Sequence, residues 1–182
     1  MTDTPMPPHP EVEPFHALPL EALIERYRSG TASLNATVLR LGDEQADQCF
    51  LPDADAGRWS CRMLLGHLAD AEMICGFRMR KLVAEPGSEM AMWDQDAFVD
   101  AGLYSGPGQP MAGFVAVVHT TRLWLSEWLG GLPEAAWACR GLHLRRGEMT
   151  LRQLVAFTAW HLEHHAWYLD RKLARLALTS SE

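Results

Sequence analysis

The sequence predicts an all-α protein, a four-helix bundle, and three observations support this fold class. Apolar residues recur every three or four positions over four long stretches, which is the spacing of one face of an α-helix. Proline, glycine and short polar segments separate these stretches. No segment of any length shows the apolar–polar alternation that is typical of a strand. Four long amphipathic helices in one chain favour a bundle.

The first two predicted helices cover 19–42 and 60–83. In the first, the apolar pattern is regular, although Gly30 and Thr31 weaken the case for one unbroken helix. A polar loop at 53–58 follows it. Ser60 has the side chain of a typical N-cap and should start the second helix, which the sequence Glu-Pro-Gly-Ser after Ala84 should end.

The third predicted helix covers 111–129 and the fourth covers 150–177. A glycine pair at 130–131 ends the third, and 132–149 should connect onward through a short turn or hairpin. The segment 87–110 is predicted to be a long loop with a helical turn. Loops of this length are uncommon in compact domains unless they have a function.

The N-terminal residues 1–17 are rich in proline and acidic residues and lack periodicity. We expect them to form a flexible or surface-draped arm, followed by a single bundle domain at 18–182. A chain of 182 residues is long enough for one such domain with a sizeable core.

Composition excludes several classes of function. A net charge of −7 argues against nucleic acid as a partner, because phosphate binding requires a basic surface. There is no apolar run of about 18 residues for a membrane span, and no basic segment followed by an apolar one for a secretory signal. We therefore expect a cytoplasmic protein whose four cysteines, none in a CxxC pair, are free thiols: Cys49, Cys61, Cys75 and Cys139.

Three histidines form the most informative pattern of the chain. His161 and His165 are four residues apart, so they share one face of the fourth helix, the face that carries its core leucines. His67 lies on the apolar face of the second helix. Burying three imidazoles without partners is costly, and a shared zinc, nickel, copper or iron ion would remove that cost. Hydrogen-bonded core histidines are the alternative, because spacing alone does not show geometry across helices.

The acidic and remaining histidine residues near this pattern receive different interpretations. Glu163 falls on the opposite side of the helix from His161, so it is predicted to be a solvated or salt-bridged surface residue and not a general base. Glu72 is expected to pair with Arg62 or Arg78. His119 is a possible replacement ligand. His164 belongs to an aromatic flank that would pack on the first helix or on another subunit: Phe157, Trp160, His164 and Trp167.

These motifs resemble those of the DinB/YfiT-like superfamily. Residues 59–72, WSCRMLLGHLADAE, resemble the pattern of a tryptophan, a serine or threonine, six residues, His-Leu, three residues and a glutamate. Residues 160–165, WHLEHH, resemble the C-terminal H-x-x-x-H of that family, and residues 93–98, WDQDAF, resemble its loop between the second and third helices. The resemblance covers nearly the whole chain after residue 18.

The resemblance implies a four-helix bundle with up-down-down-up order, often a homodimer. It also implies a divalent metal, typically nickel or zinc, held by His67, His161 and His165. Members of the family are metal-dependent hydrolases, and some relatives are transferases or isomerases that use a low-molecular-weight thiol such as bacillithiol or mycothiol.

Two further residues are candidate catalytic groups. Asp96, in the loop resembling that of the family, would accept a proton from metal-bound water, or alternatively is a turn or capping residue. Tyr168 stands where many members have glutamine, on the side of His161, and would support a ligand, donate a proton or merely fill the core.

Two main hypotheses for the function follow. The first is a metal-dependent enzyme, a hydrolase or thiol-dependent transferase, that acts on a small-molecule substrate. In this hypothesis the loop 87–110 lines an apolar pocket over the metal with four side chains: Met90, Met92, Trp93 and Phe98. The second is a non-catalytic, stress-related dimeric bundle with a structural or absent metal. A weaker third is a metal-free bundle whose histidines bond to one another and to Tyr168. An open coordination position favours the first hypothesis, and closure by a fourth protein ligand favours the second.

Overall fold

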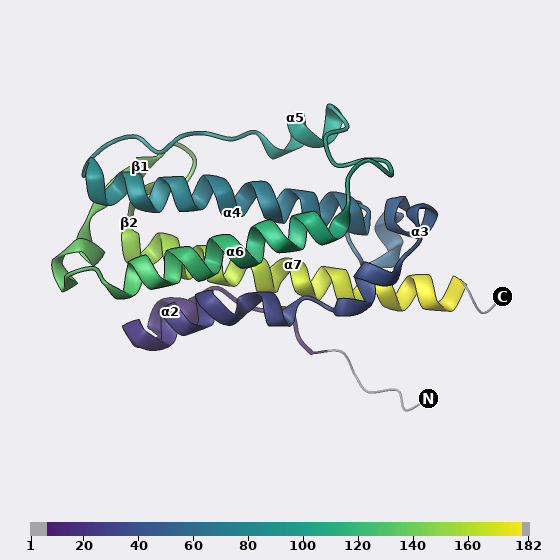
Figure 1. Cartoon of the computed structure of the whole chain (residues 1–182), viewed down its shortest axis with the longest axis horizontal. Coiled ribbons are helices and arrows are strands. Elements are labelled where there is room, and N and C mark those ends of the chain that lie inside the picture. Colours follow the sequence, from purple (N-terminus) through teal and green to yellow (C-terminus); the bar gives the residue numbers. More distant parts are fainter. Residues whose placement is uncertain (1–6, 180–182) are drawn as a thin grey trace.

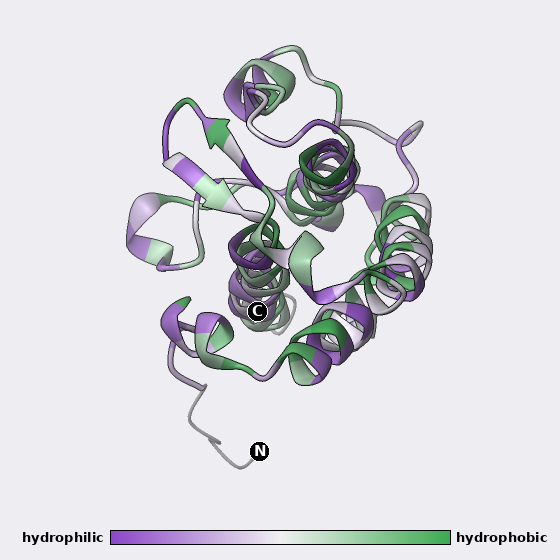
Figure 2. Cartoon of the chain, turned by 90° about the vertical axis from the view of Figure 1, so that its left-hand side faces the viewer, coloured by the Kyte–Doolittle hydropathy of each residue, from purple (hydrophilic) through white to green (hydrophobic). Residues whose placement is uncertain are grey.

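The computed structural model describes residues 7–179, and four long helices lie side by side in it (Figure 1). They are α2 (Leu20–Ser29), α4 (Cys61–Ala84), α6 (Met111–Gly130) and α7 (Leu151–Thr179). Both α2 and α4 pack against α6 and α7. Figure 2, which looks along the bundle, shows the helices arranged around a shared interior. The prediction of an all-α four-helix bundle is confirmed.

Contacts near the helix ends establish the directions of the four helices. Arg62, near the start of α4, donates a 2.7 Å hydrogen bond to the carbonyl of Gln109, just before α6. Arg152, at the start of α7, contacts the carbonyl of Leu18, just before α2, at 2.5 Å. Near the other end of α7, Arg175 bonds to the carbonyl of Ala54, ahead of α4. Thus α4 and α6 start at one end of the bundle, and α2 and α7 start at the other.

Three of the four predicted helices have the expected bounds to within two residues. The hydroxyl of Ser60 accepts a 3.1 Å hydrogen bond from the backbone N–H of Met63, as an N-cap does. The connection from α6 to α7 contains η4 (Glu134–Ala138) and the predicted hairpin, formed by β1 (Arg140–His143) and β2 (Gly147–Thr150). The loop before α6 contains a helical turn, α5 (Gln95–Asp100), and runs along the outer side of α4 (Figure 1).

The prediction of one helix over 19–42 is wrong, because α2 ends at Ser29. The chain continues through η1 (Gly30–Ser33), η2 (Ala36–Arg40), α3 (Asp43–Asp47) and η3 (Pro52–Ala54). At this end the carbonyl of Tyr27 accepts from the backbone N–H of Gly30 and, at 3.0 Å, from the guanidinium of Arg122 of α6. That group fills the space beside Gly30, where a Cβ would lie 2.2 Å from the Nη1 atom of Arg122.

The segment 7–17 lies along α7. The indole N–H groups of Trp167 and Trp160 donate to the carbonyls of Pro7 and Pro10 at 2.8 and 3.0 Å. A short helix, α1 (Glu13–Ala17), buries Phe15. The N-terminal segment therefore contacts two members of the aromatic flank, Trp160 and Trp167. Residues 1–6 of the expected arm lie outside the described part of the chain.

Two other sequence expectations concern the cysteines and the membrane. All four cysteines are free, as predicted, and Cys61 and Cys75 are buried. Within residues 7–179, no helix combines the length and the apolar character that crossing a membrane requires.

Close packing of the loop on α4 depends on Gly66. A Cβ at this position would lie 2.4 Å from Cδ1 of Tyr104, whose hydroxyl donates to the carboxylate of Asp70. We expect Gly66→Ala to lower the free energy of unfolding by about 1–3 kcal/mol, because the tyrosine ring must move. Urea denaturation measures this change.

The matched control is Gly113→Ala in α6. The added Cβ would meet only Cγ of Pro110, at 3.5 Å, which is an ordinary contact. This substitution should stabilise the protein by up to about 1 kcal/mol, because alanine is the better helix former. Equal stabilities of the Gly66→Ala protein and the wild type would contradict the close approach of Tyr104.

Candidate metal centre

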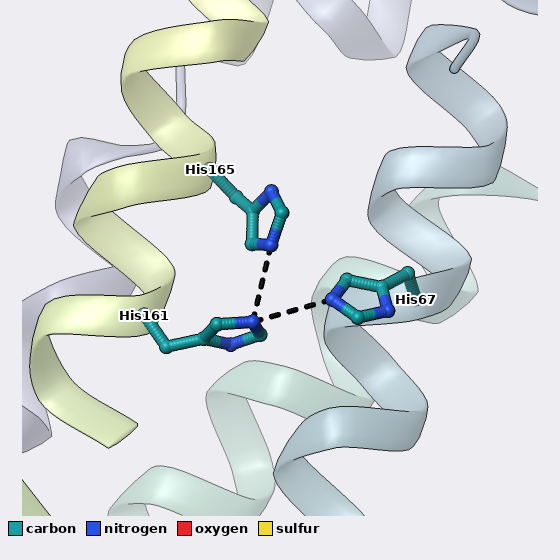
Figure 3. Close-up of side chains that lie close together, drawn as sticks. All are labelled: His67, His161 and His165. Atoms are coloured by element: carbon teal, nitrogen blue, oxygen red, sulfur yellow. Dashed lines mark hydrogen bonds between the residues drawn. The ribbon is translucent and has the colours of Figure 1, made fainter. Parts of the chain in front are cut away.

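The imidazoles of His67, His161 and His165 converge in the bundle interior (Figure 3). His67 extends from α4, while His161 and His165 extend from successive turns of α7. The Nε2 atom of His161 lies 3.3 Å from Nε2 of His67 and 3.1 Å from Nε2 of His165. One ligand atom from each residue lies within 4.8 Å of the others. The structure therefore brings together the three residues that the sequence singled out.

The donor set fits a tetrahedral transition-metal ion. Two imidazole nitrogens bound to one zinc ion at about 2.0–2.1 Å are about 3.3 Å apart, if the angle at the metal is tetrahedral. The separations of 3.3 and 3.1 Å between Nε2 of His161 and the Nε2 atoms of His67 and His165 agree with this value. A neutral imidazole nitrogen offers one proton or one lone pair, so Nε2 of His161 can satisfy only one of its two neighbours by hydrogen bonding. A cation shared by three lone pairs has no such conflict.

Burial keeps the three imidazoles in the neutral form that binds metals. His67 is 1% exposed, and burial, with a smaller effect of His164, lowers its pKa to about 4. The pKa values of His161 and His165 are also well below the usual range, first because of burial and then because of the neighbouring imidazoles. No proton has to be displaced from these nitrogens at neutral pH before a metal binds.

Two tryptophans enclose His67. The indole of Trp93, in the loop before α5, stacks on the imidazole with ring centroids 5.2 Å apart, and the indole of Trp59 lies at 4.9 Å. Three buried nitrogens here have no hydrogen-bond partner among the described residues: Nε1 of Trp59, Nε1 of Trp93 and Nδ1 of His67. Buried polar atoms are rarely left unpaired, so the cluster suits a site that receives a further group.

The centre opens into a cavity of about 500 Å³. His161 and His165 line it, together with His164, Trp93 and Trp160. Within the described residues the histidine group contains no fourth His, Cys, Asp or Glu ligand. A metal held here would thus keep a coordination position for an incoming molecule, as catalytic sites do and closed structural sites do not.

The two candidate catalytic residues lie outside this cluster. The carboxylate of Asp96 is exposed and lies 3.2 Å from Nη2 of Arg58. It is Gln95, and not Asp96, that lines the cavity. The ring of Tyr168 contacts His164, at 5.2 Å between centroids, and lines a smaller pocket beside His165. The catalytic roles of Asp96 and Tyr168 stay predictions.

The structure also tests the predictions made for two glutamates and one further histidine near the centre. Glu163 is salt-bridged to Arg26 of α2 by two contacts of 2.6 and 2.7 Å, as predicted for a residue outside the site. The predicted partner of Glu72 was wrong, because its carboxylate binds Arg122 and Tyr27. His119 lies 3.1 Å from the hydroxyl of Thr31 and does not belong to the histidine cluster.

Several residues around the centre were not found from the sequence. Trp59 was part of a motif but had no assigned contact, and the arginines of the β1–β2 turn, Arg145 and Arg146, line the cavity without having been considered. Of the loop residues expected at the pocket, Met92 and Trp93 do line the cavity. Met90 is buried in the core, and Phe98 lines a separate pocket on α4.

The fold and the site define a helical bundle with a three-histidine centre that could hold a metal. The model of the DinB superfamily matches residues 15–169, most of the chain, and the protein belongs to this family. The resemblance noted in the sequence is thereby confirmed.

Individual relatives agree with this assignment. A "Putative metal-dependent hydrolase" of Oceanobacillus iheyensis is 24% identical over 132 residues, which cover 72% of this chain and 73% of the relative. A protein of the same name from Bacillus pumilus is 22% identical over 156 residues and covers 86% of both chains. The structure of YfiT from Bacillus subtilis, described as a probable metal-dependent hydrolase with an unusual four-helix bundle topology, has a TM-score of 0.77. It is 20% identical and covers 87% of each chain, so it supports the fold.

Proposed function

We propose that this protein is a metal-dependent hydrolase in which His67, His161 and His165 hold one divalent ion, nickel or zinc. The observation that carries the proposal is the convergence of three neutral imidazoles beside an open cavity, without a fourth protein ligand in the described residues. The names of the curated relatives support the same reaction class.

The residues of the chain have distinct roles in this proposal. When bound, the ion supplies Lewis acidity and lowers the pKa of a coordinated water to about 7. The three imidazoles hold the ion, and the stacked indole of Trp93 fixes the ring of His67 and shields it from bulk water. Substrate approaches through the cavity, on the side of His161 and His165.

Transfer of a low-molecular-weight thiol to an electrophile is the second candidate function. The observation that favours it is the size of the cavity, about 500 Å³, which falls within the range of pockets that hold drug-sized ligands. Such a reaction needs room for a cosubstrate and an acceptor at once. The homodimer implied by the family stays a proposal and is compatible with either reaction.

Metal analysis of protein purified without a histidine tag tests the proposal. We expect about one transition-metal ion per chain by mass spectrometry, because three imidazoles form a single site. Removal of the ion with a chelator should abolish hydrolysis of the best substrate in an ester and amide panel, and zinc or nickel should restore it. Conjugation of a thiol, without hydrolysis, would favour the second candidate. Protein that binds no metal after incubation with zinc and nickel would contradict both.

A further inference from the structure

The cavity beside the histidine centre is cationic, although the chain as a whole is acidic. Its lining includes three arginines, Arg78, Arg145 and Arg146, and no aspartate or glutamate. The net charge of the chain is −7. The excess of positive charge in the lining of this cavity is therefore a local feature, opposite in sign to the net charge of the chain.

None of these three arginines forms an ion pair with a carboxylate among the described residues, and Arg78 is bonded instead to the carbonyl of Ala91. Arg145 and Arg146 form the turn of the hairpin between β1 and β2 and are exposed, and neither belongs to an ion pair. Arg140 of the same hairpin differs, since its guanidinium lies 2.7 Å from the carboxylate of Glu148. Within the hairpin, Arg140, which does not line the cavity, is paired with a carboxylate, whereas Arg145 and Arg146, which line it, are not.

The position of the turn is fixed by several contacts. The backbone N–H of Arg145 donates to Nδ1 of His143, and that of Arg146 donates to the carbonyl of His143. Hydrogen bonds from the N–H groups of Gly87 and Met90 tie β1 to the segment after α4. Arg145 and Arg146 therefore belong to a turn whose backbone is fixed by hydrogen bonds.

A continuous path leads from the arginines to the histidines. The guanidinium of Arg146 lies over the ring of Phe157, 4.3 Å from its centroid. The same ring stacks on His161 with centroids 5.7 Å apart. Arg78 adds a third charge at the cavity, and its Nε and Nη2 atoms donate to the carbonyl of Ala91 at 2.9 and 2.6 Å.

We propose that the cavity selects small organic anions, with the guanidinium groups of Arg145 and Arg146 holding a carboxylate or phosphate and with Phe157 and Trp93 contacting an apolar body. Guanidinium groups bind both kinds of anion through charge-assisted hydrogen bonds. A bound anion would extend from the hairpin turn toward His161, so its uncharged end would meet the open side of the centre. This inference rests on the proposed function for its chemistry, but its binding test does not need the metal.

Matched probes test this selectivity on the full chain after metal removal. The pair 3-phenylpropionate and 3-phenylpropionamide differs in charge and hardly in shape, and phenyl phosphate tests the other anion. Titrations are followed by NMR through the indole N–H signals. We expect the carboxylate or the phosphate to bind about tenfold more tightly than the amide, as one well-formed charge-assisted contact provides. The anion with the larger preference identifies the group that the site takes.

Arginine variants connect the preference to the turn. The double variant Arg145→Gln/Arg146→Gln should bind the anions and the amide equally, whereas Arg145→Lys/Arg146→Lys should keep part of the preference. Arg140→Gln, on the same hairpin but paired with Glu148, is the matched control and should behave like the wild type. Equal binding of anions and amide by the wild type, or a full preference in the glutamine double variant, would overturn the proposal.

The same samples separate this inference from the proposed function. All arginine variants should still bind zinc, because none of these residues belongs to the histidine group. Absence of metal binding with a persistent anion preference would reject the hydrolase proposal alone. Metal binding without an anion preference would reject the selectivity alone.

Discussion

Replacement of His161 by alanine is expected to abolish metal binding while the bundle stays folded. Its Nε2 atom is the one that lies within 3.3 Å of both other histidines, so its loss removes a ligand and separates the remaining two. Loss of residues that only support a ligand lowers metal affinity 10–100-fold, so loss of this ligand should lower it by more than about 100-fold. Competition with a chromophoric chelator measures the affinity.

Thermal unfolding provides a second measure for the same variant. Zinc should raise the unfolding temperature of the wild type, because a ligand that binds only the native state stabilises it, and it should have no such effect on His161→Ala. His119→Ala is the matched control: this histidine is exposed, contacts Thr31 and lies outside the cluster. A His161→Ala protein that keeps both the metal and the zinc-dependent stabilisation would contradict the three-histidine centre.

Local signals explain why most of the fold could be predicted from the sequence. The N-cap at Ser60, the glycine pair after α6 and the spacing of apolar residues each act within a few positions of the boundary that they define. The end of α2 at Ser29 coincides instead with a contact from Arg122, which is distant in sequence and donates to the carbonyl of Tyr27. A contact made by a side chain from another helix leaves no periodic signal in the segment that it meets.

The grouping of the three histidines could also be predicted from local signals, whereas the contacts between helices around them could not. Helical spacing places His161 and His165 on one face, and His67 belongs to a recognisable motif. The partner of Glu72 could not be found by this reasoning, because helical spacing suggests only partners on the same helix, whereas Arg122 is on α6. The unpaired arginines at the cavity were missed because charge on a turn usually indicates solvent, and only the packing of the hairpin brings them to the histidines.

The second large effect is expected at Arg122, a buried cation that forms three hydrogen bonds. Its side chain is completely buried, and its Nε atom lies 2.8 Å from the carboxylate of Glu72, which is 3% exposed. The two Nη atoms donate to the carbonyls of Tyr27 and Thr158 at 3.0 and 2.8 Å. One guanidinium on α6 therefore joins α2, α4 and α7, and two of its partners, Glu72 and Thr158, are close in sequence to histidines of the candidate metal centre.

Arg122→Ala should lower the free energy of unfolding by about 3–5 kcal/mol, because Glu72 would remain as an uncompensated buried charge. Arg140→Ala breaks a pair whose side chains are 60% and 59% exposed, and should cost less than about 1 kcal/mol. Chemical denaturation of both variants measures the contrast.

The double variant Arg122→Met/Glu72→Met tests the cause of this effect. It removes both charges and fills similar space, so it should be more stable than Arg122→Ala. If instead the double variant is the less stable protein, the hydrogen bonds to the carbonyls of Tyr27 and Thr158 matter more than the unpaired carboxylate. Zinc affinity of the double variant tests whether the ion pair also affects the metal centre. Thr158 lies one turn before His161, and Glu72 lies five residues after His67. A folded double variant with weakened zinc binding would show that the buried ion pair also sets the spacing of α4 and α7 on which the three imidazoles depend.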